Sequence, residues 1–370
     1  MFKDWTKLDD ANPLLRPGDE VFRCPISNSH LKWREKDVFN PSAVRHGGRV
    51  ALLFRAEDRV GPWAGTSRIG LAWSDDGRAF EVEREPVLFP ADDRWREVEW
   101  AGGCEDPRVV AAPTTHQLPG MDRPGGFVMT YTAYDGERAR LMVATSRDLR
   151  FWTKHGPALK PPYRDVWAKS GAVVTREHGG ALVAERVGGR FWMYWGEGHI
   201  FAATSRDLVQ WTVLEHEQPA DRTFTPGVGN VVKPADPPLR VARPLVSPRR
   251  GGVDGYLCEP GPAAVRTADG ITLIYNAASQ TDGPIQPGTP ERAVRYCPAR
   301  VVFDAEAPEA VIARDVSPLF EPDRDYEVAG QVNAVCFAEG LVRDPLDASR
   351  WLLYYGTADS RIAAAASTSG

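Results

Sequence analysis

The sequence predicts an all-β fold: a five-bladed β-propeller with a central active-site pocket, in which residues 1–370 form a single domain. A segment of similar character recurs five times, and radial repetition of this kind is typical of propellers. The 31 prolines, 34 glycines and 12 tryptophans are spread along the chain, which favours many short strands joined by turns. No regular amphipathic segments separate the strands, so a doubly wound α/β fold is not indicated. Two separate β-sandwiches are the competing interpretation.

The recurring segment begins with a turn residue or a charge, continues as a β-branched and aromatic run, and ends in small or polar residues. Each copy therefore predicts a buried strand with a polar end. The copies are GRVALLFRAED (48–58), GFVMTYTAYDG (126–136), GRFWMYWGEGH (189–199), GITLIYNAASQ (270–280) and RWLLYYGTADS (350–360).

A second strand follows most of these copies and ends in a hairpin signal. The pieces SDDG and SRDL favour turns through Asx-type hydrogen bonding, and an aromatic residue comes shortly after each of them. We expect Phe80, Trp152 and Trp211 to pack on the blade beneath. The stretches 112–125 and 217–252 are expected to be long loops on one face.

Composition excludes several kinds of partner. The formal net charge is −5 with both signs interspersed, which gives no basic surface for nucleic acid or an anionic membrane. The five cysteines are widely spaced without a CxxC pair, so we expect reduced, mostly buried thiols and neither a disulfide framework nor a zinc site. No pattern requires a metal or another cofactor. The start MFKDWTKLDD lacks the apolar core of a signal peptide, so a cytoplasmic protein is expected, or a periplasmic or secreted one if a leader has been removed.

Polar residues that interrupt apolar strands are the candidates for a site, because the inner strand ends of a propeller meet at the channel mouth. A group of carboxylates with an Asn, an Arg and aromatic rings suits a neutral polyol such as a sugar. The candidates are Asn40, Arg55, Glu57, Glu105, Asp106, Arg108, Lys169, Glu197, His199, Glu259 and Asp359.

The stretch AGGCEDPRVV sets two carboxylates side by side before a proline. The proline predicts an extended conformation for Asp106, and strand alternation predicts that Glu105 and Asp106 point to opposite faces. One carboxylate would then face the substrate while the other braces Arg108. A turn with a backbone cap and a surface ion pair is the structural alternative.

Glu197 and Glu259 occupy similar settings, since each follows or precedes a turn and is flanked by apolar residues that would raise a carboxyl pKa. Taken singly, each is equally well interpreted as a solvated loop carboxylate. His199 is a candidate hydrogen-bond partner, and Lys169 is a candidate for binding an anion or a neighbouring acid. The aromatic candidates for a sugar platform, with blade packing as the alternative, are Trp63, Trp73, Tyr134, Trp192 and Trp195.

Seven stretches in this order resemble glycoside hydrolase family 130, five-bladed propellers that act on β-mannosides, and the resemblance covers nearly the whole chain. They are VFNPSAV (38–44), LLFRAED (52–58), IGLAWSDDGRAF (69–80), GGCEDPRVV (102–110), the TSRDL turns and YYGTADSRIAAA (354–365). The family contains phosphorylases, which cleave with inorganic phosphate, and inverting hydrolases, which use water.

Two departures from the phosphorylase pattern favour the hydrolase branch. Gly196 and Glu197 stand where phosphorylases carry an arginine for phosphate, and an acid there would repel phosphate. The segment GGVDGYLCEPGPAAV (251–265) is similar to that of the β-1,2-mannosidase branch, as is YEVAGQVNAVCFAEGLV (326–342).

The resemblance implies an inverting, exo-acting β-mannosidase that takes mannose-containing oligosaccharides, β-1,2-linked ones first. Asp106 would be the general acid, directly or through a sugar hydroxyl, and Glu259 or Glu197 would activate water. Asn40, Arg55 and Asp359 would hold the mannose in the −1 subsite. Inversion places the two carboxyls on the order of 6.5 to 9.5 Å apart.

Two alternatives stay open. A β-mannoside phosphorylase would use Lys169, His199 and arginines such as Arg186 for phosphate and release mannose 1-phosphate. A non-catalytic glycan-binding propeller would keep the pocket without the reaction. Linkage and chain length depend on loops such as 112–125, 217–252 and 281–292, and the oligomeric state cannot be read from the sequence.

Overall fold

The chain is almost entirely β-structure. The computed structural model describes residues 2, 4–61, 65–218, 239–282 and 293–368. Within these ranges the α-helices are two single turns, α1 (Arg96–Glu99) and α2 (Asp325–Val328). The prediction of many short strands without long helices is confirmed. Residues 219–238 and 283–292, which belong to two of the loops expected to set specificity, lie outside the described ranges.

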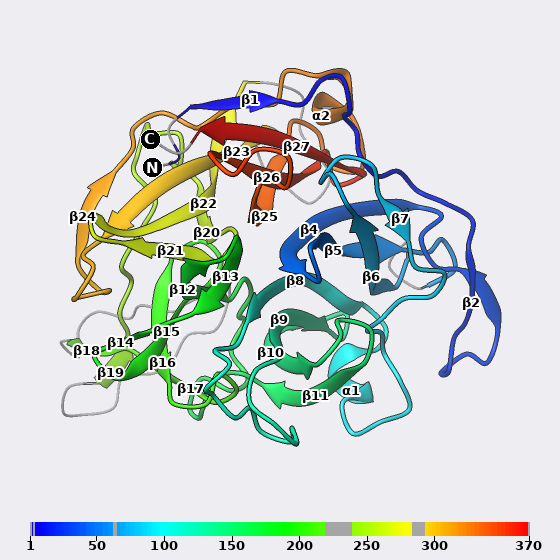
Figure 1. The fold of residues 1–370 in the computed structure, drawn as a ribbon, viewed down its shortest axis with the longest axis horizontal. Coiled ribbons are helices and arrows are strands. Elements are labelled where there is room, and N and C mark those ends of the chain that lie inside the picture. Colours follow the sequence, from blue (N-terminus) through cyan, green and yellow to red (C-terminus); the bar gives the residue numbers. More distant parts are fainter. Residues whose placement is uncertain (1, 3, 62–64, 219–238, 283–292, 369–370) are drawn as a thin grey trace.

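Antiparallel sheets follow one another along the chain and lie in a ring around a common centre, which gives a propeller-like arrangement (Figure 1). Two of these sheets come from the first half of the chain, and each pairs its strands in sequence order. The first contains β4 (Asp37–His46), β5 (Arg49–Glu57), β6 (Ser67–Ser74) and β7 (Glu81–Val82), and the second contains β8 (Gly103–Ala111), β9 (Phe127–Tyr134), β10 (Ala139–Ser146) and β11 (Trp152–Pro157).

The next two sheets have a divided inner part. In the third, β12 pairs with β15 and also forms a hairpin with β13, while β14 pairs with the start of β15. In the fourth, β20 and β21 pair with successive parts of the long strand β22. Their strands are β12 (Ala172–His178), β13 (Ala181–Ala184), β14 (Arg186–Val187), β15 (Arg190–Trp195), β16 (Phe201–Ser205) and β17 (Trp211–Val213), then β20 (Leu257–Pro260), β21 (Ala264–Thr267), β22 (Gly270–Thr281), β23 (Ala293–Phe303) and β24 (Val311–Arg314).

The last sheet joins the two ends of the chain. The N-terminal strand pairs with the C-terminal one, Trp5 lying opposite Ser367, and Figure 1 shows this blue strand beside the red one. The side chain of Asn12 exchanges two hydrogen bonds with the backbone of Ala364, at 2.9 and 2.8 Å. The sheet contains β25 (Cys336–Arg343), β26 (Arg350–Thr357), β27 (Arg361–Thr368) and β1 (Trp5–Lys7).

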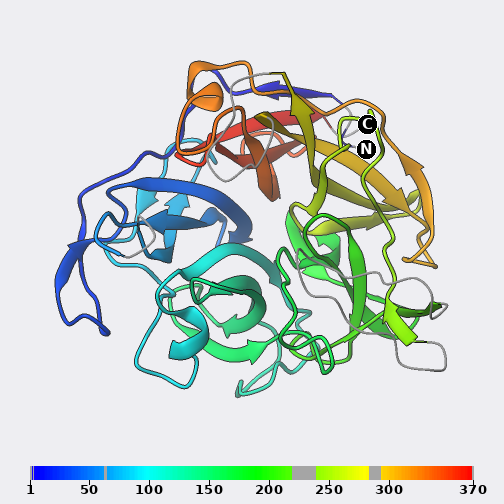
Figure 2. The same ribbon diagram turned by 180° about the vertical axis from the view of Figure 1, so that it is seen from behind.

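Two short hairpins lie outside these sheets. One pairs β2 (Val21–Arg23) with β3 (His30–Lys32), and the other pairs β18 (Glu215–Gln218) with β19 (Leu239–Ala242). The view from behind shows β2 and β3 projecting from the rim beside the first sheet (Figure 2). None of the described residues of these two hairpins lines the cavity at the centre of the ring.

The five recurring segments form β5, β9, β15, β22 and β26, each the neighbour of an inner strand. The hairpin turns after them also form as expected: the hydroxyl of Ser74 accepts the N–H of Gly77, and Asp76 accepts those of Arg78 and Ala79. The SRDL pieces repeat this pattern at Asp148 and Asp207. The polar side chains of these turns are used in hydrogen bonds to their own backbone. Polar side chains that can reach a ligand are therefore expected at the opposite ends of the strands.

The aromatic residues after the turns pack as predicted. Phe80 meets the ring of Tyr354 edge-on, which joins the first sheet to the last. Trp152 packs against one hydrophobic core and Trp211 is fully buried in another. The five cysteines are buried free thiols, as expected.

The inner strands are interrupted where they reach the centre. β4 shifts register between Phe39 and Pro41, and β8 does so between Glu105 and Arg108. Within these shifts the backbone is left-handed at one residue each, with φ of 49° at Asn40 and 47° at Asp106. Asn and Asp tolerate this region better than other non-glycine residues, so the two motifs NP and DP make the same bulge on neighbouring sheets.

Candidate active site

A cavity of 200 Å³ opens at the centre of the ring, among residues from all the radial sheets. Bulges and turns at the strand ends supply most of its polar side chains. Seven of the predicted site residues line it: Asn40, Arg55, Asp106, Lys169, Glu197, Glu259 and Asp359. The remaining lining residues are Phe39, Tyr296, Val332, Val335 and Phe337.

Arg55, at the end of β5, organises one side of the cavity. Its guanidinium contacts Glu57 at 2.7 Å, Glu105 at 3.0 Å and Asp106 at 3.3 Å. Its face lies 4.7 Å from the centroid of the Phe39 ring. Three carboxylates and an aromatic face hold this cation, and an arginine fixed in this way presents a rigid set of donors.

Asp106 is the most strongly held carboxylate of the cavity and is 2% exposed. Asn40 donates to Oδ1 at 2.8 Å, Arg55 contacts the same oxygen, and Lys169 lies 3.4 Å from Oδ2. Burial alone would raise the pKa of Asp106, but Lys169, Arg55 and Arg108 outweigh it and hold this pKa well below its ordinary value. Asp106 is therefore ionised in the empty cavity.

The conformation predicted for the Glu105-Asp106 pair is wrong. Asp106 is left-handed rather than extended, because the β8 bulge takes up an extra residue there. The bulge also breaks strand alternation, so both carboxylates reach the same guanidinium of Arg55. Burial raises the pKa of Glu105, against the opposing effect of Arg55.

The prediction that a carboxylate of Glu105 or Asp106 pairs with Arg108 is wrong as well. Its guanidinium forms an ion pair with Glu339 at 2.9 Å and donates to the carbonyls of Pro260 and Gly261 at 2.9 and 3.0 Å. Only the backbone carbonyl of Asp106 joins this set, at 3.1 Å. Arg108 thus ties the second sheet to the fourth and fifth beneath the cavity.

Two glutamates form the opposite side of the cavity. Trp167 donates its indole N–H to Glu197 at 2.5 Å, and the hydroxyl of Ser170 donates to Glu259. Burial raises the pKa of Glu259 to about 7, although Lys169 and Arg108 oppose the change, and Glu197 adds to the rise. A carboxyl with this pKa exchanges a proton near neutral pH, which suits general acid–base work.

The turn that carries Glu197 depends on Gly196. This glycine has φ of 121°, and a Cβ added to it would lie 2.4 Å from the carbonyl oxygen of His199. Its N–H donates to the carbonyl of Lys169 at 2.9 Å, which fastens the turn to the segment carrying the lysine. The sequence GEGH therefore orients Glu197 toward the cavity.

Lys169 and Asp359 complete the polar lining. Burial would lower the pKa of Lys169, but Glu197, Asp106 and Glu259 raise it well above its ordinary value, so the ammonium stays charged. Burial raises the pKa of Asp359 to about 7 despite the opposing effect of Arg55. The ammonium lies between carboxylates of both sides.

Four predicted site residues stand behind the cavity and do not line it. Glu57 pairs with Lys36 at 2.6 Å as well as with Arg55, and Glu105 and Arg108 make the contacts given above. His199 shares a hydrogen bond of 2.9 Å with Ser247. Arg186, the phosphate candidate, contacts His116 and the carbonyl of Arg206 at 3.2 Å.

The aromatic residues expected as sugar platforms pack in the sheets. Trp195 is fully buried in a core, Trp73 and Trp192 bond Glu83 and the carbonyl of Val187, and Tyr134 bonds the carbonyl of Gly136. Trp63 lies outside the described residues. The rings that line the cavity belong instead to Phe39, Tyr296 and Phe337.

Sequence reasoning missed three supporting residues: Glu339, Ser170 and Trp167. Glu339 is 1% exposed and pairs with Arg108. It interrupts the apolar run VCFAEGLV, the same signal that selected Arg55. Ser170 and Trp167 flank Lys169 in VWAKSG and carry no signal of their own, since only the fold brings them to Glu259 and Glu197.

The described residues contain neither a metal-binding cluster nor a membrane-spanning helix. No group of three or more His, Cys, Asp or Glu side chains in the described ranges could hold a metal ion. None of the helices found there is long and apolar enough to cross a membrane.

Comparisons with known proteins cover nearly the whole chain. A family model described as beta-1,4-mannooligosaccharide phosphorylase matches residues 9–369. A 1,2-beta-oligomannan phosphorylase of Thermoanaerobacter sp. (strain X514) is 28% identical over 362 residues, which cover 95% of this chain and 96% of the relative.

Two solved structures are more similar in sequence. A putative glycosidase from Bacteroides thetaiotaomicron VPI-5482 has a TM-score of 0.82 and 36% identity, covering 99% of this chain and 97% of its own. A structure from work on glycoside hydrolases of the GH130 family that target beta-1,2 mannosidic linkages in Candida mannan has the same TM-score and identity. It covers 100% of this chain and 94% of its own.

Proposed function

Because the chain belongs to glycoside hydrolase family 130, we propose that it is an inverting, exo-acting β-mannosidase built as a five-bladed propeller. Its first substrates are β-1,2-linked mannooligosaccharides. Asp106 acts as the general acid, and Glu259, with Glu197 beside it, activates water. The radial sheets are the five blades, and the central cavity is the −1 subsite.

The observation that carries hydrolysis over phosphorolysis is the charge of the cavity. Four carboxylates line it, those of Asp106, Glu197, Glu259 and Asp359, against the two cations Arg55 and Lys169. Both cations already contact carboxylates. An added phosphate dianion would have to compete with these carboxylates for both cations, whereas water and a neutral sugar would not.

The two glutamates support a water site on one side of the sugar. Glu259 and Glu197 are each oriented by a donor, Ser170 and Trp167, and both lie near the ammonium of Lys169. An inverting hydrolase needs one carboxylate to take a proton from water while a second carboxylic acid protonates the leaving oxygen. Glu259 is the proposed base because its pKa of about 7 matches neutral pH.

The proton balance follows from the two pKa values. Acid and base together must carry one proton to start the reaction. In the empty site that proton rests on Glu259, because the pKa of Asp106 is held low. Bound substrate must therefore favour the arrangement with the proton on Asp106, either at the leaving oxygen or through a sugar hydroxyl.

The cavity lining offers a bound sugar both polar groups and apolar faces. Asn40 and Arg55 present N–H groups, Asp359 presents a carboxyl, and the rings of Tyr296 and Phe337 offer apolar faces to sugar C–H groups. A cavity of 200 Å³ suits one terminal sugar unit, which supports removal of units from a chain end.

Phosphorolysis is the second candidate, because the curated relatives that match the chain are named phosphorylases. Turnover of a panel of β-linked mannobioses in phosphate-free buffer, repeated with added phosphate, separates the two. The proposal expects free mannose at the same rate in both buffers and fastest turnover of the β-1,2 isomer. Turnover that requires phosphate and yields mannose 1-phosphate would replace the hydrolase proposal.

A further inference from the structure

A second cavity lies at the outer edge of the second sheet, remote from the centre of the ring. It measures 540 Å³, more than twice the volume of the central cavity, and the two share no lining residue. One wall comes from β11, the outermost strand of the sheet, and the rest comes from the segment between β7 and α1. Its volume falls within the range of roughly 300 to 1,000 Å³ that ligand pockets occupy.

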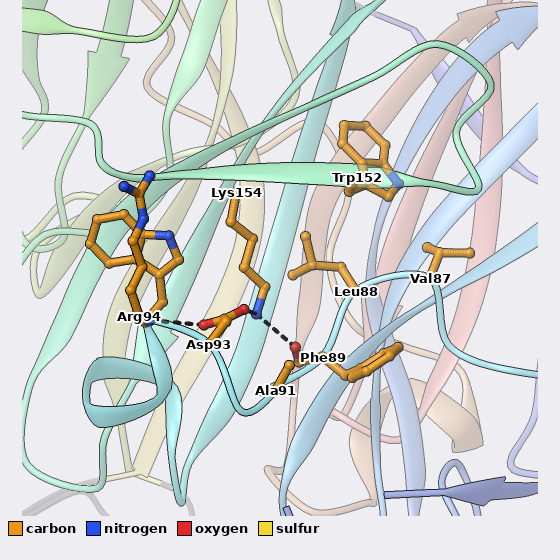
Figure 3. A pocket seen from close by; sticks show the side chains of 9 residues that line it. Val87, Leu88, Phe89, Ala91, Asp93, Arg94, Trp152 and Lys154 are labelled. Atoms are coloured by element: carbon orange, nitrogen blue, oxygen red, sulfur yellow. Dashed lines mark hydrogen bonds and ion pairs between the residues drawn. The ribbon is translucent and has the colours of Figure 1, made fainter. Parts of the chain in front are cut away.

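Aromatic and apolar side chains form the walls of this outer cavity. In Figure 3, Trp152 stands on one side and Arg94 on the other, with Lys154 between them. Trp95 packs directly on β11, where Gly156 has φ of 97° and an added Cβ would lie 2.1 Å from the indole. The guanidinium of Arg94 lies 4.5 Å from the centroid of the Trp95 ring. Trp152 and Trp95 are both partly exposed, together with Phe89.

Polar groups at the base of the outer cavity are fixed and nearly neutral in sum. The ammonium of Lys154 donates to the carbonyl of Phe89 at 2.8 Å and contacts Asp93 at 3.2 Å and Glu99 at 2.5 Å. Asp93 in turn accepts the backbone N–H of Trp95 at 2.8 Å. The cations Lys154 and Arg94 balance the two carboxylates, so the cavity has no excess charge for an ionic ligand.

We propose that the outer cavity is a second carbohydrate-binding site for a neutral oligosaccharide. Partly exposed indoles stack on the C–H faces of sugar rings, the carboxylate of Asp93 accepts hydrogen bonds from hydroxyls, and the guanidinium of Arg94 donates hydrogen bonds to them. A mannose-containing chain is the ligand only if the proposed function is correct. The site would hold a long substrate on the protein while its end is shortened in the central cavity.

Calorimetric titration of a variant that binds without turnover tests this site. The ligand is a β-1,2-linked mannotetraose, and the background substitution is Glu259→Gln. We expect the added Trp152→Ala to remove one binding site per chain. The matched control is Trp192→Ala, because that tryptophan is also partly exposed and lines neither of the two cavities.

A second substitution covers the case in which loss of Trp152 disturbs folding. Arg94 is exposed and stacks on Trp95, so Arg94→Ala leaves the core intact. Loss of this cation–π contact and its donors should weaken the outer site by about two- to fivefold. Trp152→Phe, which keeps an aromatic wall, should retain part of the binding.

The outcomes separate this site from the proposed function. The same number of sites with and without Trp152, together with an unchanged affinity in Arg94→Ala, would overturn the second site. A change in oligomeric state on Trp152→Ala would also overturn it, because the cavity would then be a subunit contact. If the wild type cleaves no β-mannoside but glycan binding still depends on Trp152, the proposed function fails and the second site stands.

Discussion

The two sides of the central cavity use charge differently. On the Asp106 side, Arg55 touches three carboxylates and Asn40 adds a donor, so the groups hold one another in place. On the Glu259 side, each glutamate has a neutral donor from Ser170 or Trp167, and Lys169 is the cation whose charge acts on both. The first side depresses a carboxyl pKa, and the second raises one to about 7.

This difference shows how one cavity separates an acid from a base. Desolvation raises the pKa of both Asp106 and Glu259, and the three cations near Asp106 outweigh it whereas the two near Glu259 do not. A site whose two carboxyls differ in this way stores its single proton on one side and delivers it from the other.

Removing the carboxylate of Asp106 should have the largest effect. Asp106→Asn keeps the shape but removes the acid, so kcat on β-1,2-mannobiose should fall by about 10²- to 10⁴-fold. Steady-state rates measure the loss, and a thermal unfolding curve checks that the variant is folded. Near-wild-type activity would show that the acid lies elsewhere.

The two glutamates should differ in importance. Glu259→Gln should lower kcat by about 10²- to 10⁴-fold, and Glu197→Gln should cost less, if Glu259 takes the proton from water. Parallel rate measurements on the two variants decide between them. A larger loss for Glu197→Gln would exchange the two roles.

The ion pair behind the cavity should matter for stability. Arg108→Ala leaves Glu339 buried without its cation, and we expect a loss of about 3 to 5 kcal/mol in the free energy of unfolding. Urea unfolding measures it. Arg176→Ala is the matched control, because Arg176 pairs with Glu185 near the surface and should cost under about 1 kcal/mol. Equal losses in the free energy of unfolding for the two variants would show that the buried pair contributes no more to stability than the surface pair.

The pH profile should follow the proton stored on Glu259. Below about pH 7 the pair holds its one proton, and above it Glu259 is deprotonated and no proton remains for Asp106. The value of kcat/KM should therefore fall as pH rises through about 7, by up to about tenfold per pH unit. A flat profile to pH 9 would contradict this account of the pair.

Arg186 should have the smallest effect. It contacts His116 and the carbonyl of Arg206 and does not line the central cavity. Arg186→Ala should change kcat/KM by less than about twofold with or without phosphate, as is usual for surface substitutions. A selective loss of phosphate-dependent turnover would instead identify Arg186 as a phosphate ligand.

Much of the architecture could be predicted because it depends on local chemistry. Apolar runs closed by Ser and Asp turns predicted the strands and hairpins, and polar or charged residues that interrupt apolar runs predicted seven residues of the cavity lining. Each of these signals lies within about ten residues of chain. The agreement therefore concerns features that a short segment specifies by itself.

The wrong predictions concern residues whose positions depend on a backbone bulge or on contacts between distant parts of the chain. Alternation placed Glu105 and Asp106 on opposite faces, but a bulge at the left-handed Asp106 brought both to Arg55. Arg108 was assigned a neighbour in sequence, yet its partner is Glu339, 231 positions away on another sheet. Such pairings depend on how the sheets are placed around the centre, which local patterns do not encode.

The central claim is inverting hydrolysis, and proton NMR of the first products tests it most directly. The methyl glycoside of β-1,2-mannobiose, whose leaving sugar has no free anomeric carbon, is incubated with the protein in buffers with and without phosphate, and the anomeric signals are followed from the start. The account predicts free α-mannose appearing first, at a rate that phosphate does not change. Mannose 1-phosphate as the product, or β-mannose appearing first, would contradict it.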